Sequence, residues 1–344
     1  MDQNPNSKSS KSLIETLFDG LWTPVKFLGR GSSAVVFLAQ GRDGKRVVIK
    51  VIEGGFQDED MEMRFSRECS ALEKLSHENI VKPIDWGVRR ACPFIVFSHV
   101  PGRSLRDEIS RGPINWRDSV YFCLKLSNAL EHAHSFGIIH RDVKPENILI
   151  NDGEPLLLDF GLAKCGFGEK AKTRTGVIVG TPAYMAPEIL YGKAANPSSD
   201  LYALAVVLGE LLSRQALFFG NLSKILHDKL NFRQRLETIP LSDCPEARRV
   251  RGLLGELLLP EREKRIQSAG IVAARLEEIL YSEPESSGEQ EAEKTQKMPS
   301  LSPKTAGRTA EAAGRTAEAA GRTAEAAGRT AEAAGRTAEA VGRT

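Results

Sequence analysis

Gly29 and Gly31, separated by one residue, form the first pattern in the chain that could bind a ligand. They lie between two apolar runs, at 25–28 and 35–38. Because glycine has no Cβ, the backbone amides beside it can approach a phosphate closely. The strand–Gly-x-Gly–strand pattern alone is equally consistent with a hairpin turn that binds nothing. It therefore indicates a candidate phosphate-binding loop that needs support from other parts of the sequence.

Lys50 and Glu68 form a second pattern, since each carries a charge in apolar surroundings. Lys50 stands in the β-like run 47–52, and Glu68 stands in a stripe of apolar residues at helical spacing. The stripe consists of Met61, Phe65, Leu72 and Leu75. A buried charge is costly unless an opposite charge meets it, so we expect the two residues to form an ion pair. The alternative is a lysine that reaches out to solvent and a glutamate at the edge of its helix.

Three motifs follow between residues 140 and 188. HRDVKPEN occupies 140–147 after a helix-like apolar pattern, DFG at 159–161 ends a strand-like run, and APE occupies 186–188. In this order the motifs resemble those of a protein kinase, and specifically those of the bacterial serine/threonine kinases that are related to the eukaryotic ones. The resemblance covers about residues 23–281, three quarters of the chain.

The resemblance implies a role in phosphoryl transfer for each polar residue of these motifs. Positioning and charge neutralisation supply most of the catalysis in this reaction. Asp142 would accept the proton of the substrate hydroxyl and orient it. Lys144 would neutralise the γ-phosphate of ATP. Asp159 and Asn147 would each hold a Mg²⁺ ion, which prefers such hard oxygen ligands.

The resemblance also implies an ATP site in which Lys50 holds the α- and β-phosphates and Glu68 holds Lys50. The nucleotide-binding residues that it implies are Gly29, Arg30, Gly31, Val36, Val48, Lys50, Ser98, Val100 and Leu149. Two positions depart from the family pattern, because Ala34 replaces the third glycine of the loop and Val48 replaces the usual alanine above the adenine. Neither change removes a catalytic group.

Two further contacts that the resemblance implies are structural. Asp200 opens the apolar run 201–212, which is typical of a buried central helix. This aspartate would hold the backbone of the His-Arg pair at 140–141. Arg265 would pair with Glu188 of the APE motif. We expect the loss of either contact to destabilise the domain without acting on the chemical step.

Lys144 and the residues that lie between the DFG and APE motifs indicate which hydroxyl groups accept the phosphate and how the activity is regulated. The Lys144 position and the segment 180–184 are typical of serine/threonine kinases, and Thr181 would bond to the catalytic groups. Thr173 and Thr175 are the expected autophosphorylation sites. A phosphate there would add nearly two negative charges and could pair with Arg141.

The order of elements predicts an α+β fold, because short β-like runs come first and helical patterns dominate from about residue 117. The resemblance makes this the two-lobed protein kinase fold. We expect a small β-rich N-lobe with one regulatory helix, at about 23–97, and a larger helical C-lobe, at about 101–281, which together form a kinase domain at 23–281.

Segments outside this domain are polar. Residues 1–22 are a polar lead-in that ends in a short amphipathic piece, and 282–305 have the composition of a linker. Residues 306–344 are five copies of AGRTAEA followed by VGRT. Glycine and threonine weaken a helix in every copy, so we expect a disordered or weakly helical tail without chemistry. An assembly or tethering element is the alternative.

Composition excludes several other classes of protein. The chain has 344 residues, 41% hydrophobic and 27% charged, with a net charge of +2, which gives no argument for nucleic acid as a partner. Its five cysteines are scattered and form no C-x-x-C pair, which favours reduced thiols in the cytoplasm. No run approaches 18 apolar residues, and the N-terminus lacks the apolar core of a secretory signal, so we expect no membrane span.

The expected function is therefore that of an ATP- and Mg²⁺-dependent serine/threonine protein kinase, which acts on protein substrates and on itself in trans. One alternative is a pseudokinase or scaffold, against which the chain retains Lys50, Asp142, Asn147 and Asp159. Another is a small-molecule phosphotransferase, against which the chain has an APE motif and a long preceding loop. A P-loop is excluded because no G-x-x-x-x-G-K-[ST] occurs.

Overall fold

The computed structural model describes residues 18, 20–31, 34–56, 59–160, 182–241 and 244–281. All of them belong to one compact unit, Met1–Pro284. Several predictions lie outside the described residues: the phosphorylation sites Thr173 and Thr175, the bonds of Thr181, most of the lead-in 1–22, the linker 282–305 and the tail 306–344.

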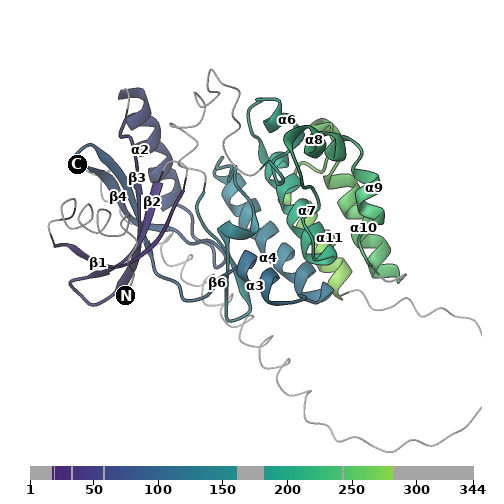
Figure 1. The fold of residues 1–344 in the computed structure, drawn as a ribbon, viewed down its shortest axis with the longest axis horizontal. Helices are drawn as coiled ribbons and strands as arrows, with labels where there is room; N and C mark the ends of the chain where they lie inside the picture. Colours follow the sequence, from purple (N-terminus) through teal and green to yellow (C-terminus); the bar gives the residue numbers. More distant parts are fainter. Residues whose placement is uncertain are drawn as a thin grey trace, which may run out of the picture. The chain divides into compact units, whose positions relative to one another are not determined.

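Among the described residues, a five-stranded antiparallel sheet and the helix α2 form the first part of this unit (Figure 1). The strand order is β1-β2-β3-β5-β4. The strands are β1 Trp22–Arg30, β2 Ala34–Gly41, β3 Arg46–Ile52, β4 Pro83–Arg89 and β5 Cys92–Ser98, and the helix is α2 Glu59–Glu73. The β-branched and aromatic residues of β2, β3 and β5 favour strands and bury most of their side chains. Phe18 closes one side of this small core, packed edge-on against Trp22 and Phe94.

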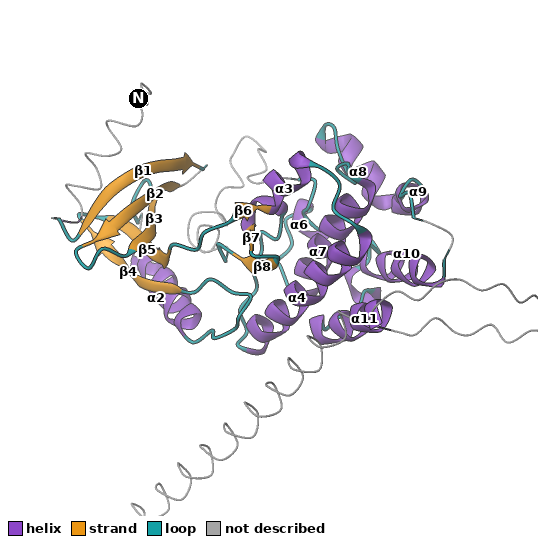
Figure 2. Cartoon of the chain, turned by 90° about the horizontal axis from the view of Figure 1, so that it is seen from below, coloured by secondary structure: helices purple, strands orange, loops and turns teal. Residues whose placement is uncertain are grey.

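Helices make up most of the second part (Figure 2). They are α3 Leu105–Arg111, α4 Trp116–Ser135, α6 Pro187–Leu190, α7 Pro197–Ser213, α8 Leu222–Leu230, α9 Phe232–Glu237, α10 Pro245–Leu257 and α11 Ala269–Tyr281. A three-stranded sheet lies among them, in the order β6-β7-β8. Its strands are β6 Arg103–Ser104, β7 Ile148–Asn151 and β8 Glu154–Leu157, and the 3₁₀ turn η1 Pro145–Asn147 precedes β7.

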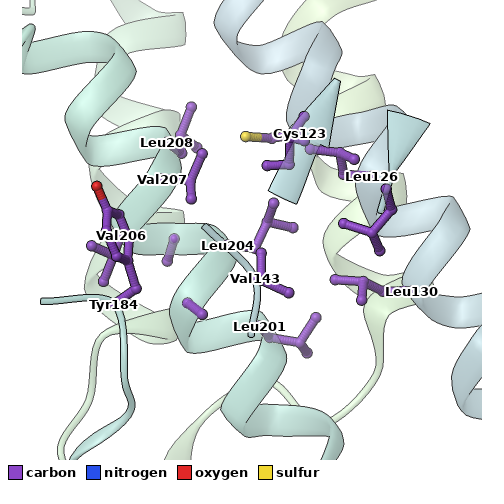
Figure 3. Close-up of a cluster of buried hydrophobic side chains, with 14 of the residues drawn as sticks. Cys123, Leu126, Leu130, Val143, Tyr184, Leu201, Leu204, Val206, Val207 and Leu208 are labelled. Carbon is purple, nitrogen blue, oxygen red and sulfur yellow. The ribbon is translucent and has the colours of Figure 1, made fainter. Parts of the chain in front are cut away.

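The central helix α7 organises the core of the helical part. Asn196 and Ser199 form a capping box at its start, with Pro197 in the first turn. Every residue from 198 to 212 is buried, which confirms the predicted buried helix. Residues 140–147 form the HRD segment. Figure 3 shows its Val143 packed among side chains from α4 and α7. The segment that carries the candidate catalytic residues is therefore packed against the buried core of the helical part.

The predicted two-lobed α+β fold is confirmed, with a small sheet lobe that carries one helix and a larger helical lobe. The sheet β6-β7-β8 was not anticipated as a sheet, because strands of two to four residues are too short to show a period. Within the described residues, no helix has the length and apolar character needed to cross a membrane.

Candidate active site

Asp200 at the start of α7 fixes the backbone of the HRD segment. Its two carboxylate oxygens accept the N–H groups of His140 and Arg141, each at 2.8 Å. Arg141 takes a positive φ of 65°, so these bonds stabilise a backbone conformation that arginine rarely adopts. The predicted role of Asp200 is confirmed. His134 of α4 adds a third contact to this carboxylate, with Nε2 at 2.9 Å from Oδ2.

His140 joins the HRD segment to the strand that leads into the DFG motif. Its Nε2 lies 2.8 Å from the carbonyl oxygen of Leu158, and its Nδ1 accepts the N–H of Asp142 at 3.2 Å. The ring also packs on Phe160, with ring centroids 4.7 Å apart. Burial lowers the pKa of the imidazole, which favours the neutral form with the proton on Nε2. The buried side chain of His140 thus joins the HRD segment to the DFG motif.

Asp142, Lys144 and Asn147 form one cluster, as the motif predicts. Lys144 Nζ lies 2.7 Å from Asp142 Oδ2, and Asn147 Nδ2 lies 2.9 Å from the same oxygen. Asn147 Nδ2 also donates to the backbone oxygen of Asp142 at 2.8 Å. With its NH₂ group turned to Asp142, the amide oxygen of Asn147 faces the other side. The carboxylate of Asp142, the ammonium of Lys144 and the amide oxygen of Asn147 therefore lie close together within six residues of the chain.

Asp159 is held next to this cluster. The N–H of Leu158 donates to the backbone oxygen of Asn147 at 2.9 Å, which ties the two segments together. Asp159 has a φ of 54°, a conformation that Asp tolerates better than most residues. Its Oδ1 lies 3.1 Å from Lys50 Nζ of β3. The ion pair joins the sheet lobe to the helical lobe across the site.

The predicted ion pair between Lys50 and Glu68 is not present among the described contacts, and this expectation is corrected. Lys50 pairs with Asp159, whereas Glu68 Oε1 lies 3.9 Å from Arg141 Nη1. The buried stripe of α2 consists of Met61, Phe65, Cys69 and Leu72. Glu68 stands at the edge of this stripe with 31% of its side chain exposed, so its charge remains partly hydrated without the lysine.

The candidate phosphate loop is the connection between β1 and β2, closed by the N–H of Gly31 on the carbonyl of Ala34 at 2.8 Å. A Cβ added at Gly29 would meet nothing within 4 Å, and one at Gly31 would meet only an ordinary contact at 3.7 Å. The protein itself therefore does not require glycine at either place. The space is available to a ligand that approaches the backbone. Arg30 points elsewhere, to Glu53 at 2.8 Å.

The remaining nucleotide-binding candidates lie on the strands beside this loop. Val36 and Lys50 are direct partners across β2 and β3, so their side chains share one face of the sheet. Val48 shares that face, being two residues before Lys50 on the same strand. Ser98 ends β5, and the connection that follows it contains Val100. Leu149 is on β7, where it pairs with Ser104.

A polar network that the sequence did not predict ties the segment after the long loop to the catalytic segment. Tyr184 donates its hydroxyl to Glu210 of α7 and accepts a bond from Arg106 of α3. Arg106 also binds Glu210 at 2.6 Å and Glu146 at 2.8 Å. Glu146 directly precedes Asn147. The signal that could have revealed this network is Glu210 itself, an acid in an otherwise apolar helical run.

The predicted pair of Glu188 and Arg265 is confirmed. Two bonds, at 2.8 and 2.7 Å, join the guanidinium to both carboxylate oxygens, and the side chains are 4% and 0% exposed. Burial opposes the charged carboxylate, but the bonds and charge of Arg265 outweigh it and hold the pKa of Glu188 below its ordinary value. Ser199 donates a further bond to Glu188 at 2.8 Å.

Comparisons with known proteins agree with this geometry. Residues 22–276 match the family model described as protein kinase domain. A serine/threonine-protein kinase PknK from Mycobacterium bovis is 41% identical over 211 residues, which are 60% of this chain and 18% of that protein. A probable serine/threonine-protein kinase PknB from Lactococcus lactis is 37% identical over 215 residues, 60% of this chain and 34% of that protein. This chain thus matches 18% and 34% of the length of these two relatives.

Solved structures show the same fold. The crystal structure of the PknI kinase domain from Mycobacterium tuberculosis has a TM-score of 0.58 at 23% identity, and covers 75% of this chain and 96% of that one. The structure of Rad53 1–466 in complex with AMP-PNP has a TM-score of 0.59 at 22% identity, and covers 74% of this chain and 64% of that one.

Proposed function

The chain belongs to the protein kinase domain family, and from that premise we propose that it transfers the γ-phosphate of ATP to serine and threonine hydroxyls of proteins. The observation that carries the proposal is the cluster of Asp142, Lys144 and Asn147, with Asp159 tied beside it and Lys50 reaching it from the sheet lobe. Every charged group that phosphoryl transfer requires is present. Neither the described residues nor the comparisons favour the pseudokinase alternative.

Asp142 is proposed to receive the hydroxyl of the substrate. Its carboxylate is fixed by Lys144 and Asn147, so it can orient a hydroxyl and accept its proton without reorganising. Lys144, 2.7 Å from this carboxylate, can then reach the phosphoryl group as it passes to the hydroxyl. The two charges compensate each other before the substrate arrives.

ATP and Mg²⁺ fit the remaining groups. The amide oxygen of Asn147 and the carboxylate of Asp159 are hard oxygen donors, and each can hold a Mg²⁺ ion because Mg²⁺ takes its other ligands from phosphates and water. When bound, the metal neutralises charge on the phosphates. Lys50 would exchange Asp159 for the α- and β-phosphates, beneath the open backbone of Gly29 and Gly31. We assign the adenine to Val36, Val48 and Leu149 and the connection from Ser98 to Val100. Arg30 is assigned to the phosphate loop, where its side chain is paired with Glu53.

Glu68 is proposed to join Lys50 only after Arg141 finds another partner. In the structure Arg141 lies near Glu68. A phosphate on Thr173 or Thr175, added by a second copy of the chain, carries more negative charge than a carboxylate and would compete for Arg141. Glu68 would then be released toward Lys50. We also propose that the chain acts on protein substrates. We propose that it is located in the cytoplasm, where its free cysteines would remain reduced.

The test of this function is a transfer assay on the purified chain with labelled ATP, Mg²⁺ and casein as acceptor. We expect phosphoserine and phosphothreonine, no phosphotyrosine, and no transfer when EDTA removes the metal. Asp159→Asn is expected to lower kcat by about 10²-fold or more, because a metal contributes several kcal/mol of charge stabilisation and 1.36 kcal/mol is tenfold. Unchanged turnover in a folded Asp159→Asn variant would contradict the proposed metal site, and an absence of label on protein would contradict the proposed function.

A further inference from the structure

Lys229 of α8 is a lysine whose side chain is completely buried, although none of the roles above uses it. Its neighbour Lys224, on the same helix, keeps its side chain 45% exposed and pairs with Asp228 at 2.7 Å. Lysine is rarely buried without a partner, because removing its charge from water is costly. The contacts of Lys229 therefore call for an explanation.

The ammonium of Lys229 is held by one carbonyl and two aromatic rings. Nζ donates to the backbone oxygen of Ala183 at 2.6 Å. It lies 4.2 Å from the ring centroid of Phe218 and 4.9 Å from that of Tyr202. The faces of the rings stabilise a cation in place of water. The side chain thus reaches from α8 to the segment 182–186.

The charges around Lys229 make this placement costly. The carboxylate of Glu188 favours a charged Lys229, but Arg265 already binds both oxygens of that carboxylate. The guanidinium of Arg265 also lies over the Tyr202 ring, with Cζ 4.8 Å from the ring centroid. Burial, and then the charge of Arg265, lower the pKa of Lys229 well below its ordinary value. The amine donates to Ala183 in either protonation state. An apolar side chain would fill the same space at lower cost, so the distinctive contribution of lysine is this hydrogen bond.

The bond to Ala183 holds a segment that is linked by hydrogen bonds to the part of the chain that carries the catalytic residues. Ala183 precedes Tyr184, whose hydroxyl is bound by Glu210 and Arg106. Arg106 continues to Glu146 in the catalytic segment. The segment 182–186 therefore has two anchors, the Tyr184 side chain on Glu210 and Arg106 and the Ala183 carbonyl on Lys229 of α8. Through these bonds the segment is coupled to the part of the chain that carries Asp142, which would bind the hydroxyl of a protein substrate.

We propose that Lys229 is a positioning residue that fixes the segment 182–186 against α8 and thereby sets how well a protein substrate binds. The proposal rests on the proposed kinase function, because it concerns the protein substrate of the same site. Under this proposal Lys229 affects the binding of the protein substrate and not the binding of ATP, since Lys229 contacts neither the candidate ATP residues nor the candidate metal ligands.

Steady-state kinetics with casein and ATP test the proposal through Lys229→Met, which keeps an unbranched side chain one atom shorter and removes the donor. The KM for casein is expected to rise roughly tenfold, equivalent to about 1.4 kcal/mol, with kcat and the KM for ATP within about twofold. Lys229→Gln, which retains an N–H donor, is expected to restore part of the loss. Lys224→Met is the matched control on the exposed side of α8 and should leave all three constants unchanged.

Hydrogen exchange gives a second readout that needs no catalytic activity. In the chain without ATP, Lys229→Met is expected to speed exchange of the amides at 183–186 while those within α7 keep their protection. Faster exchange throughout α7, with kcat and both KM values affected together, would show that Lys229 only stabilises the lobe and would overturn the proposal. Unchanged casein KM and unchanged exchange would also overturn it. If the unmodified chain transfers no phosphate, the proposed function fails, and the exchange result still decides whether Lys229 holds the segment.

Discussion

Replacing Asp142 with Asn is expected to lower kcat for phosphate transfer by about 10²–10⁴-fold, the range that a positioned general base contributes. The amide has nearly the shape of the carboxylate, so Lys144 and Asn147 keep a neighbour of the same size. It has no negative charge and cannot take the proton of the substrate hydroxyl. We expect the KM for ATP to stay within about twofold, because Asp142 belongs to the acceptor side of the site.

Asp152→Asn is the matched control for this variant. Asp152 is exposed in the turn between β7 and β8, with a φ of 50° that Asn also tolerates. Rates measured with labelled ATP and casein, together with thermal unfolding of each variant, distinguish loss of chemistry from loss of fold. Wild-type turnover in folded Asp142→Asn would show that Asp142 is not the base.

Replacing Arg265 with Met is expected to lower the free energy of unfolding by about 3–5 kcal/mol, the cost of leaving one partner of a buried ion pair alone. Glu188 would lose both of its bonds to the guanidinium and keep the bond from the hydroxyl of Ser199. The carbonyls of Leu259 and Pro260 would lose donors at 2.6 and 2.9 Å. Urea unfolding followed by circular dichroism measures the change.

Arg275→Met provides the comparison for Arg265. Arg275 binds Glu256 at the same 2.7 Å, but these side chains are 38% and 49% exposed. Solvent screens such a pair, so its loss is expected to cost no more than about 1 kcal/mol. Adding Glu188→Gln to Arg265→Met should recover part of the loss, because it removes the buried charge. Equal destabilisation by Arg265→Met and Arg275→Met would contradict the buried-pair account.

Contacts inside short motifs were predictable from the sequence. Asp142, Lys144 and Asn147 lie within six residues, so local chain geometry already limits their separation. Asp200 and the pair of Glu188 and Arg265 were predictable for a different reason. Each is a charged residue at a fixed place relative to a recognisable motif, and the family resemblance named its partner.

Contacts that depend on how the lobes meet could not be predicted in the same way. One helical position turns a side chain by about 100°, which moves Glu68 from the buried stripe to its edge and puts Cys69 inside. Asp159 then competes with Glu68 for Lys50, which no spacing along the chain reveals. The network of Arg106, Tyr184 and Glu210 joins three distant segments, so it became visible only in the folded chain.

Magnesium-dependent self-phosphorylation tests the central claim most directly. The purified chain is incubated with Mg²⁺ and labelled ATP, and the modified residues are mapped by mass spectrometry, with Lys50→Met and Asp142→Asn as inactive controls. The kinase account predicts label on Thr173 or Thr175 that is absent from both variants. A folded wild-type chain that binds ATP and transfers no phosphate to itself or to casein would contradict it.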